Sequence, residues 1–336
     1  MRQVSIIHIN LNAQNVYRSL KLGYVPGMEN VIELRELTKT YGSRRGLTGL
    51  SLDVVQGEVF GFLGPNGAGK STTIRLLLDL IRPTGGSASV LGLDPRSEGV
   101  ELRRRVGYLA GDFVCDGRQN VRSYLRFLAQ LRGGVPQARI DDLADRLGLD
   151  QSAKIKKLSK GNRQKVGLVQ AFMHAPELLV LDEPSSGLDP LVQQTFLDMV
   201  GEAAAGGQTV FMSSHIMSEV EAVADRVGII RDGHLVALDA VANLRTGVVC
   251  DIQVTFGTSV PAKAFEGVPG GERLRLDESG TKVTGQVSGS PDALIKALAR
   301  YTVTSLRASE PALDELFHSY YEGAEAAPRT ESAPIA

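Results

Sequence analysis

Apolar residues recur over the first two-thirds of the chain in short runs, separated by longer stretches with helical spacing. Five runs have the length of strands: 31–34, 50–55, 58–63, 178–181 and 209–212. A helix is expected to carry Ile74, Leu76, Leu77, Leu78 and Leu80 and to end before Pro83. Strands that alternate with helices in this way predict an α/β core.

Turns and one helical segment interrupt this alternation. The polar segment 38–46 is interpreted as a turn after the first strand, and residues 227–238 predict a hairpin with Asp232 and Gly233 at its turn. From Ser97 onward the pattern is mainly helical, with breaks at Gly133, Gly134 and Pro136. We therefore expect an inserted helical lobe at about 97–175.

The pattern changes after Gly247, where polar and apolar residues alternate as in strands with one solvated face. Three segments alternate in this way: 251–256, 272–276 and 282–287. A helix with Ser290 as its cap and Pro291 at its first position is expected to use Leu294, Ile295 and Leu298, before a last strand at 302–306. The predicted organisation is an N-terminal extension (1–27), an α/β domain (28–246), a small α+β domain (247–323) and a disordered tail (324–336).

Composition narrows the class of protein. The 336 residues contain 37 Lys and Arg against 38 Asp and Glu, so there is no excess of basic residues of the kind that predicts nucleic-acid binding. Cys115 and Cys250 show neither a pairing pattern nor metal-ligand spacing, which suits a reducing compartment. Apolar runs are all shorter than a membrane span, and the N-terminus is too polar for a signal peptide. We expect a soluble cytoplasmic protein that reaches a membrane only through a partner.

The strongest chemical signal is a glycine-rich turn between a predicted strand and a predicted helix. The residues are Gly64, Pro65, Asn66, Gly67, Ala68, Gly69, Lys70, Ser71 and Thr72. Glycines let backbone N–H groups turn toward phosphate oxygens, Lys70 supplies a positive charge, and Ser71 offers a hydroxyl to Mg²⁺. The sequence therefore predicts a nucleotide-phosphate site here.

Three further positions carry side chains suited to nucleotide chemistry, each with a structural alternative. Asp182 and Glu183 lie at the end of a buried strand, where open α/β sheets place ligands. Asp182 can therefore hold Mg²⁺, and Glu183 can orient and deprotonate a water. Without the glycine-rich turn beside them, the two residues would be interpreted as caps of the next element. His215 follows another strand and suits a γ-phosphate contact, although a lone histidine is more often a surface or core residue. Tyr41 can stack on a base, or be an ordinary exposed turn residue.

A second anion-binding helix start lies at "LSKGN", residues 158–162. Ser159 is a good N-cap, and Gly161 leaves the backbone open. The order of all these segments between Val31 and Leu238 resembles the ATP-binding subunit of ABC transporters. In that resemblance Tyr41 is the A-loop aromatic, 64–72 the Walker A motif, 158–162 the signature, Asp182 and Glu183 the end of Walker B, 186–189 the D-loop and His215 the switch histidine.

The resemblance implies a P-loop NTPase of ABC type with a core sheet, a helical lobe and a small C-terminal α+β accessory domain. It implies ATP and Mg²⁺ as ligands, Lys70, Glu183 and His215 as catalytic residues, and Ser71 and Asp182 as metal ligands. It also implies a pair of ATP-binding subunits in which Ser159 and Gly161 contact the partner's ATP, and a separate integral membrane permease at the cytoplasmic face of the cell membrane. Single-cassette exporters of drugs and antibiotics are the most similar members.

Two positions depart from the family pattern. Lys160 and Asn162 replace the usual signature residues, and Gly111 stands where the family has a glutamine that contacts Mg²⁺ or the attacking water. Asp112, a backbone carbonyl or packing of the lobe is expected to replace that glutamine. Two alternative functions stay open: a soluble ATPase of this type acting on ribosomes or DNA, and a regulator that binds ATP without turnover.

Overall fold

The computed structural model describes residues 29–42, 44–115, 117–245, 249–261, 263–271, 273–288 and 291–309. Two compact units divide between Ala240 and Val241, and each is described by itself. The proposed extension at 1–27, the proposed tail at 324–336 and the expected domain boundary at 246 and 247 lie outside the described residues. So does residue 290, the expected helix cap.

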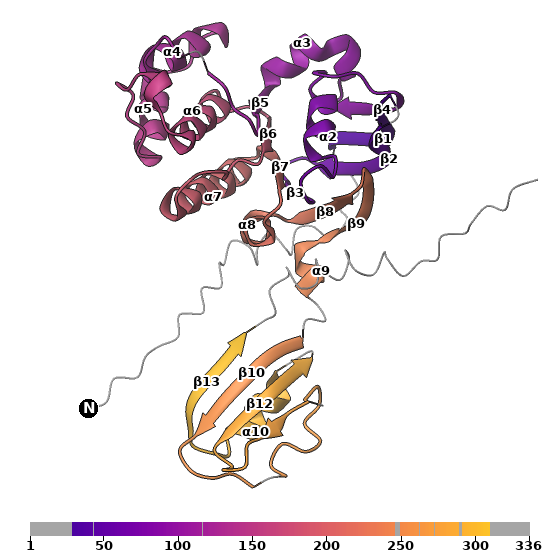
Figure 1. Ribbon diagram of the computed structural model, residues 1–336, viewed down its shortest axis with the longest axis vertical. Helices are drawn as coiled ribbons and strands as arrows, with labels where there is room; N and C mark the ends of the chain where they lie inside the picture. The colour runs from indigo at the N-terminus through magenta and orange to yellow at the C-terminus, as the bar shows by residue number, and fades with distance from the viewer. Residues whose placement is uncertain are drawn as a thin grey trace, which may run out of the picture. The chain divides into compact units, whose positions relative to one another are not determined.

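A six-stranded sheet forms the centre of the first unit (Figure 1). Its order is β5 (Val106–Leu109), β6 (Leu178–Asp182), β7 (Thr209–Ser214), β3 (Val59–Leu63), β8 (Arg226–Arg231) and β9 (His234–Ala240). The pairs from β5 to β8 are parallel, and β8 pairs with β9 as an antiparallel hairpin. Every residue of β3 and β6 is buried, which explains their continuous apolar sequences. The predicted α/β core is confirmed.

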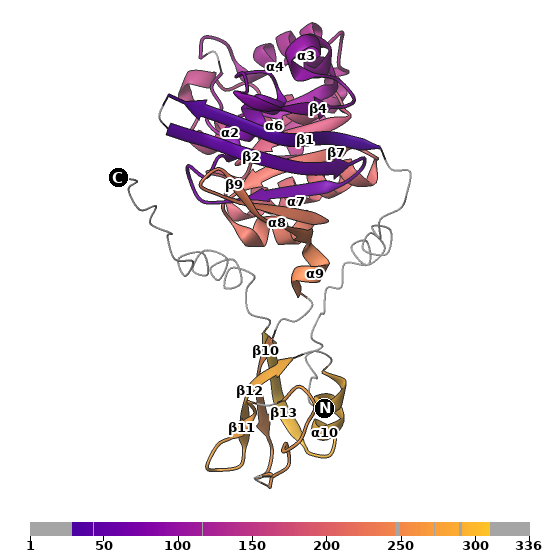
Figure 2. The same cartoon turned by 90° about the vertical axis from the view of Figure 1, so that its right-hand side faces the viewer.

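A second, antiparallel sheet has the order β2 (Arg44–Val55), β1 (Asn30–Tyr41) and β4 (Gly85–Val90). Figure 2 shows β1 and β2 side by side across this unit. The turn expected at 38–46 is wrong for its first part, because Thr40 pairs with Arg45 and Tyr41 with Arg44. Strand β1 continues into this polar stretch because its main chain pairs with β2 on one edge and β4 on the other. The hydrophobic pattern alone assigns the same stretch to a turn.

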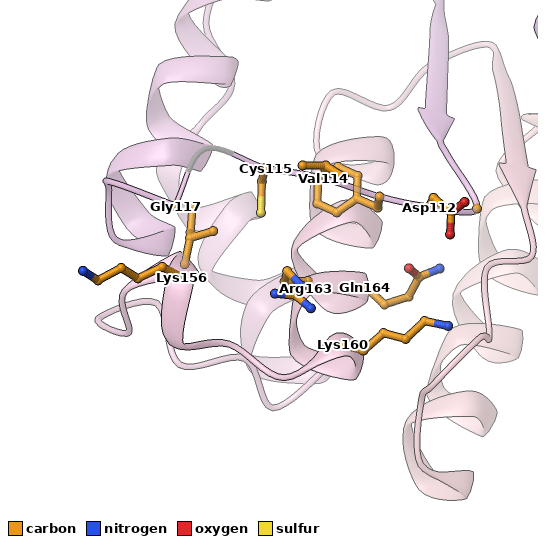
Figure 3. Close-up of a pocket in the computed structure, with 11 residues that line it drawn as sticks. Asp112, Val114, Cys115, Gly117, Lys156, Lys160, Arg163 and Gln164 are labelled. Carbon is orange, nitrogen blue, oxygen red and sulfur yellow. The ribbon is translucent and has the colours of Figure 1, made fainter.

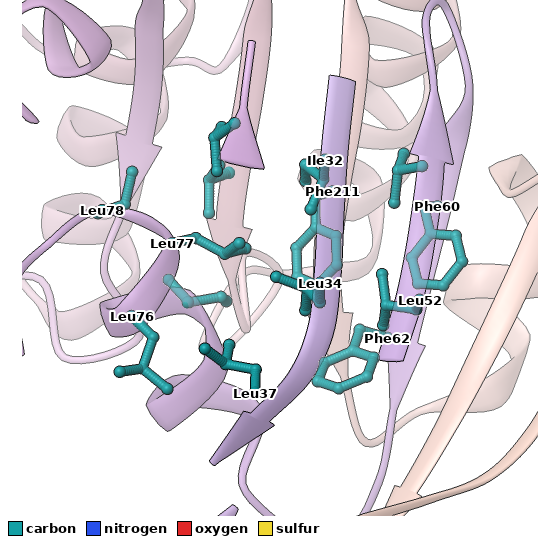
Figure 4. Close-up of a cluster of buried hydrophobic side chains, with 14 of the residues drawn as sticks. Ile32, Leu34, Leu37, Leu52, Phe60, Phe62, Leu76, Leu77, Leu78 and Phe211 are labelled. Carbon is teal, nitrogen blue, oxygen red and sulfur yellow. The ribbon is translucent and has the colours of Figure 1, made fainter. Parts of the chain in front are cut away.

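Helix α2 (Lys70–Leu77) lies between the two sheets and unites their cores (Figure 4). Buried side chains from β1, β2, β3, β7 and α2 form one cluster, which includes Ile32, Leu34, Leu52, Phe60, Phe62, Leu77 and Phe211. The Phe60 and Phe211 rings stack with centroids 5.6 Å apart. The helix is shorter than expected: Asp79 is in the left-handed region at φ 55° and Leu80 is exposed.

Helices cover the rest of the first unit. They are α3 (Pro95–Arg105), α4 (Val121–Leu131), α5 (Gln137–Arg146), the 3-10 helix η1 (Ile155–Lys157), α6 (Lys160–Phe172), α7 (Pro190–Ala205) and α8 (Met217–Val223). Figure 1 shows α4, α5 and α6 grouped beyond the β5 edge of the sheet. Within the segment expected to be a helical lobe, residues 106–109 instead pair with β6, because the buried side chains of Val106 and Leu109 complete the sheet. Helices α4, α5 and α6, which follow β5, make up the lobe.

The second unit contains the short helix α9 (Val241–Arg245) and an antiparallel sheet with the order β11 (Arg275–Leu276), β12 (Lys282–Ser288), β10 (Val249–Phe256) and β13 (Val303–Ser309). Helix α10 (Asp292–Leu298) packs Leu294 and Leu298 against its apolar face. Ile295 was expected on the same helix face but is 54% exposed, since it lies about 100° from Leu294 around the helix. Alternating strands and one covering helix are the α+β arrangement that the sequence predicts.

Candidate nucleotide site

The glycine-rich turn lies between β3 and α2, at the carboxyl end of the central strand. A Cβ at Gly64 would lie 2.4 Å from the Ile230 carbonyl oxygen, so only glycine lets the turn pack against β8. Gly69 has φ 117° and caps α2, and a Cβ there would lie 2.9 Å from the Gly46 carbonyl oxygen. Pro65, Asn66 and Gly67 stay exposed. The turn is therefore anchored at both ends and open at its tip, as a phosphate cradle requires.

Lys70, the first residue of α2, turns its side chain back under this turn. Its Nζ donates to the carbonyl oxygens of Gly64 at 2.5 Å and Pro65 at 3.2 Å, and lies 3.0 Å from Glu183 Oε1. The side chain is only 5% exposed. A buried ammonium needs such partners because its desolvation is costly. The arrangement holds one positive charge beneath the position where phosphate oxygens would lie.

Asp182 is the last residue of β6 and Glu183 follows it, and the two carboxylates have different surroundings. Asp182 is buried and its Oδ1 accepts a hydrogen bond from Ser213 Oγ at 2.6 Å. Glu183 has φ 47°, an uncommon conformation for a non-glycine residue, and its N–H bonds both the carbonyl oxygen and Oγ of Ser213. The charge of Asp182 also contributes, after burial, to raising the pKa of Tyr108 on β5.

His215 and Lys70 flank the Glu183 carboxylate. His215 Nδ1 is 2.6 Å from Glu183 Oε2, while Oε1 has Lys70 beside it at 3.0 Å but makes no hydrogen bond. Thus one oxygen is held by the imidazole and the other is buried with unused acceptor capacity. A carboxylate of this kind can orient a water and accept its proton.

One oxygen donor at the end of β6 and another at the start of α2 suit Mg²⁺. Asp182 supplies a buried carboxylate, and Ser71, half-buried in the first turn of α2, supplies a hydroxyl. Among the described residues, no group of three or more His, Cys, Asp or Glu side chains is placed to hold a metal. A Mg²⁺ ion bound together with nucleotide phosphates takes most of its ligands from water and phosphate oxygens. It therefore needs only one or two oxygen donors from the protein.

Ser159 and Gly161 lie at the start of α6 and make different contacts. Ser159 caps the helix by accepting a hydrogen bond from the Asn162 N–H at 3.2 Å, and it stays exposed. A Cβ at Gly161 would lie 2.4 Å from the Gly187 carbonyl oxygen, so the helix start packs directly on the 183–187 segment. The signature segment is therefore exposed at Ser159 and packed against Gly187 at Gly161.

Tyr41 lies at the end of β1 rather than within a turn. Its ring is 46% exposed, has Lys39 Nζ 5.2 Å from its centroid, and packs on Gly46, where a Cβ would lie 2.7 Å from the ring. Because the Gly46 carbonyl oxygen also lies close to Gly69, the ring is near the phosphate turn. An exposed aromatic face beside that turn is suited to stacking on a base.

Gly111 begins a segment that approaches Asp182 closely. A Cβ at Gly111 would lie 3.3 Å from both Cγ and Oδ2 of Asp182. The segment also borders a pocket of about 360 Å³ that faces η1 and α6 (Figure 3). Its lining includes Asp112, Cys115, Lys156, Lys160, Arg163 and Gln164. Cys115 is half-buried here.

Sequence reasoning missed the buried polar residues that brace these segments. Ser213 holds Asp182 and Glu183, Gln164 on α6 donates to main-chain carbonyls of the same loop, and Glu219 on α8 accepts from Ser185 Oγ at 2.7 Å and Ser214 Oγ at 3.0 Å. Ser213 and Glu219 are close in sequence to His215, and this proximity was the one sequence signal that could have indicated a role at the site. Apart from Ser214, which is five residues from Glu219, their partners are distant along the chain, so those contacts could not be inferred.

Comparison with known proteins agrees with this geometry. A family model described as ABC transporter matches residues 47–186. The bacitracin transport ATP-binding protein BcrA of Bacillus licheniformis is 39% identical over 62% of this chain and 69% of its own length. The daunorubicin resistance ATP-binding protein DrrA2 of Streptomyces coeruleorubidus is 33% identical over 85% of this chain and 93% of its own length.

Solved structures share the fold. An ATP-binding subunit of an ABC transporter has a TM-score of 0.60 at 30% identity and covers 64% of this chain and 92% of its own. An ATP-binding cassette dimer in a post-hydrolysis state bound to ADP and Pi has a TM-score of 0.58 at 21% identity, covering 62% and 98%. The resemblance drawn from the ordered motifs is confirmed: the chain belongs to the ABC transporter family, and its first unit is an ABC-type ATPase domain.

Proposed function

We propose that this chain is the ATP-hydrolysing subunit of an exporter for a drug or antibiotic, working with a separate membrane permease. One observation supports the assignment of ATP hydrolysis to particular residues. The Glu183 carboxylate lies between Lys70 Nζ at 3.0 Å and His215 Nδ1 at 2.6 Å. The cargo class is supported by relatives whose names refer to bacitracin transport and daunorubicin resistance.

Each side chain has a distinct task in this proposal. Lys70 and the N–H groups of the glycine-rich turn bind the β- and γ-phosphates, and Glu183 orients the attacking water and accepts its proton. His215 keeps the Glu183 carboxylate turned toward that water. Ser71 and Asp182 would hold Mg²⁺, which neutralises charge that develops on the phosphate oxygens. Tyr41 stacks on the base.

Two chains are proposed to enclose two ATP molecules. The exposed cap of α6 supports this pairing, because in the part of the chain that the structure describes Ser159 accepts a hydrogen bond only from within α6 and Gly161 lies against Gly187, so the exposed helix end can contact a partner. A helix N-terminus stabilises an anion by about 0.3–2 kcal/mol, too little to hold ATP alone but enough to help distinguish ATP from ADP.

A mixture of Lys70→Ala and Ser159→Arg chains tests this pairing. Each variant alone carries its defect in both sites of a dimer, whereas a mixed dimer has one doubly defective site and one intact site. Hydrolysis should therefore recover in the mixture if one site can fire alone. If mixing gives no activity beyond the sum of the two variants, either the signature acts within its own chain or both sites must fire, and a fused dimer with one Lys70→Ala half separates these outcomes.

The permease is proposed to dock on the exposed apolar side chains of α3 and α4. Val100, Phe127 and Leu131 are 66%, 50% and 68% exposed. Over the described residues, no helix has the length and hydropathy to cross a bilayer. The chain would therefore lie at the cytoplasmic face of the membrane through this contact.

Copurification with a polytopic membrane protein coexpressed from a neighbouring gene tests the docking proposal. Leu131→Glu should lower copurification, whereas Val236→Glu on the exposed strand β9 is the matched control. Equal recovery of both variants would place the permease elsewhere.

A further inference from the structure

The Gln164 side chain is buried on α6 and reaches the loop that carries Glu183. Its Nε2 donates to the carbonyl oxygens of Glu183 at 3.2 Å and of Pro184 at 3.0 Å, and the residue is only 3% exposed. Both donors of one primary amide are thus available to two successive main-chain carbonyls. Buried carbonyls without such donors would be costly, so this contact is a strong constraint on the local backbone.

The constraint acts on a residue whose backbone is strained. Glu183 has φ 47°, and its N–H is held by Ser213 on β7. With Gln164 on the carbonyl side, the Glu183 residue is held from two directions. A non-glycine residue stays in the left-handed region only when its surroundings impose it. Release of the carbonyl would let φ return to negative values and move the carboxylate away from Lys70 and His215.

The same helix start also supports the residues that follow. Gly161 lies against the Gly187 carbonyl oxygen, and Lys160 Nζ donates to Ser186 Oγ at 3.2 Å. Three successive contacts therefore join the first turns of α6 to the segment 183–187. The signature end of α6 is thus joined directly to the segment that carries Glu183.

We propose that Gln164 is a positioning residue for ATP hydrolysis, which fixes the Glu183 main chain to α6 so that the signature end and the carboxylate move together. This inference rests on the proposed catalytic role of Glu183. Since Ser159 and Gly161 are proposed to close on the partner's ATP, closure at that site would be transmitted to Glu183 of the other site.

The test compares Gln164→Met, which keeps the volume but loses both donors, with Gln170→Met as the matched control. Gln170 lies on the same helix and accepts from the Tyr124 hydroxyl at 3.2 Å, away from the loop. For each full-length variant, kcat, KM for ATP, the Hill coefficient, the equilibrium Kd for ATP and the melting temperature are measured. Gln164→Met should lower kcat about tenfold or more and reduce the Hill coefficient, while the Kd for ATP stays the same or falls by up to about fivefold as the carboxylate leaves Lys70.

Combination with Glu183→Gln decides whether Gln164 acts through that carboxylate. If it does, Gln164→Met should lower the residual rate of Glu183→Gln no further. An additional loss of similar size in that background, a loss matched by Gln170→Met, or a wild-type kcat in Gln164→Met would overturn the proposal. If Gln164→Met does not fold, Gln164→Asn, which keeps a primary amide but is one methylene too short to reach both carbonyls, must show the same pattern. Normal turnover by Glu183→Gln would instead refute the role of Glu183 itself.

Discussion

Lys70 Nζ and Glu183 Oε1 lie 3.0 Å apart, which places the proposed phosphate-binding ammonium beside the proposed catalytic base. Lys70 belongs to the first turn of α2 and Glu183 follows β6, so the contact joins the ends of two neighbouring elements of the core. A γ-phosphate that reaches Lys70 must share the ammonium with this carboxylate. The pair therefore couples nucleotide binding to the position of the base.

Glu183→Gln should slow hydrolysis and strengthen ATP binding together. Loss of a general base costs about 10²–10⁴-fold in kcat. Removal of the competing negative charge should lower the Kd for ATP about fivefold, equivalent to about 1 kcal/mol. Phosphate release and equilibrium ATP binding measure the two effects, with Glu101→Gln, an exposed carboxylate on α3, as control. Normal turnover would refute the catalytic assignment, and an unchanged Kd would show that Glu183 does not compete for Lys70.

Gly111→Gln should impair the site rather than restore a missing contact. Its Cβ would lie 3.3 Å from Asp182 Cγ, so the carboxylate must shift. We expect the Mg²⁺ concentration for half-maximal ATPase to rise and kcat to fall, by up to about tenfold, with Gly111→Ala acting in the same direction. Magnesium titration of the ATPase measures this. A faster enzyme would mean that a glutamine can act here as it does elsewhere in the family.

Alanine at two helical glycines should change stability with opposite signs. Gly201 in α7 has open space around a built Cβ, so Gly201→Ala should raise the free energy of unfolding by about 0.5–1 kcal/mol. Gly161→Ala would place its Cβ 2.4 Å from the Gly187 carbonyl oxygen and should lower it by about 1–3 kcal/mol. Urea denaturation measures both. Stabilisation by both substitutions would contradict the close packing of α6 on the 183–187 segment.

His174 should make the protein less stable in mild acid. Burial, and then the charge of Arg132 beside it, lower its pKa to about 4, against about 6.5 for an unperturbed histidine. Between these pH values the unfolded chain binds the proton and the folded protein does not, so the free energy of unfolding falls as the pH is lowered through this window.

His174→Gln keeps polar contacts but does not titrate, so its stability should fall less than that of wild type between pH 7 and pH 5. The exposed His234 on β9 offers the matched control, His234→Gln. Urea unfolding at both pH values gives the comparison. An unchanged pH dependence in His174→Gln would show that His174 binds its proton equally well in both states.

Much of the core was predictable because periodicity and motif spacing are local. The buried strands at 178–181 and 209–212 are continuous apolar runs. The turn from Gly64 to Thr72 is recognisable from its glycines, two of which, Gly64 and Gly69, allow a close backbone approach. Predictions were wrong where pairing overrode the local pattern, as at Thr40 in β1, or where a strand too short for periodicity joined the sheet, as at Val106.

By itself the sequence determined the α/β class and, through its ordered motifs, the family, and it predicted the residues proposed to carry the chemistry, since these depend on residue types at fixed spacing. Only the tertiary structure decided how those residues meet: Glu183 between Lys70 and His215, Gln164 on the Glu183 carbonyl, and Gly111 against Asp182. The physical reason is that each contact joins segments far apart along the chain. Their approach is set by strand order and helix packing, which no local pattern encodes.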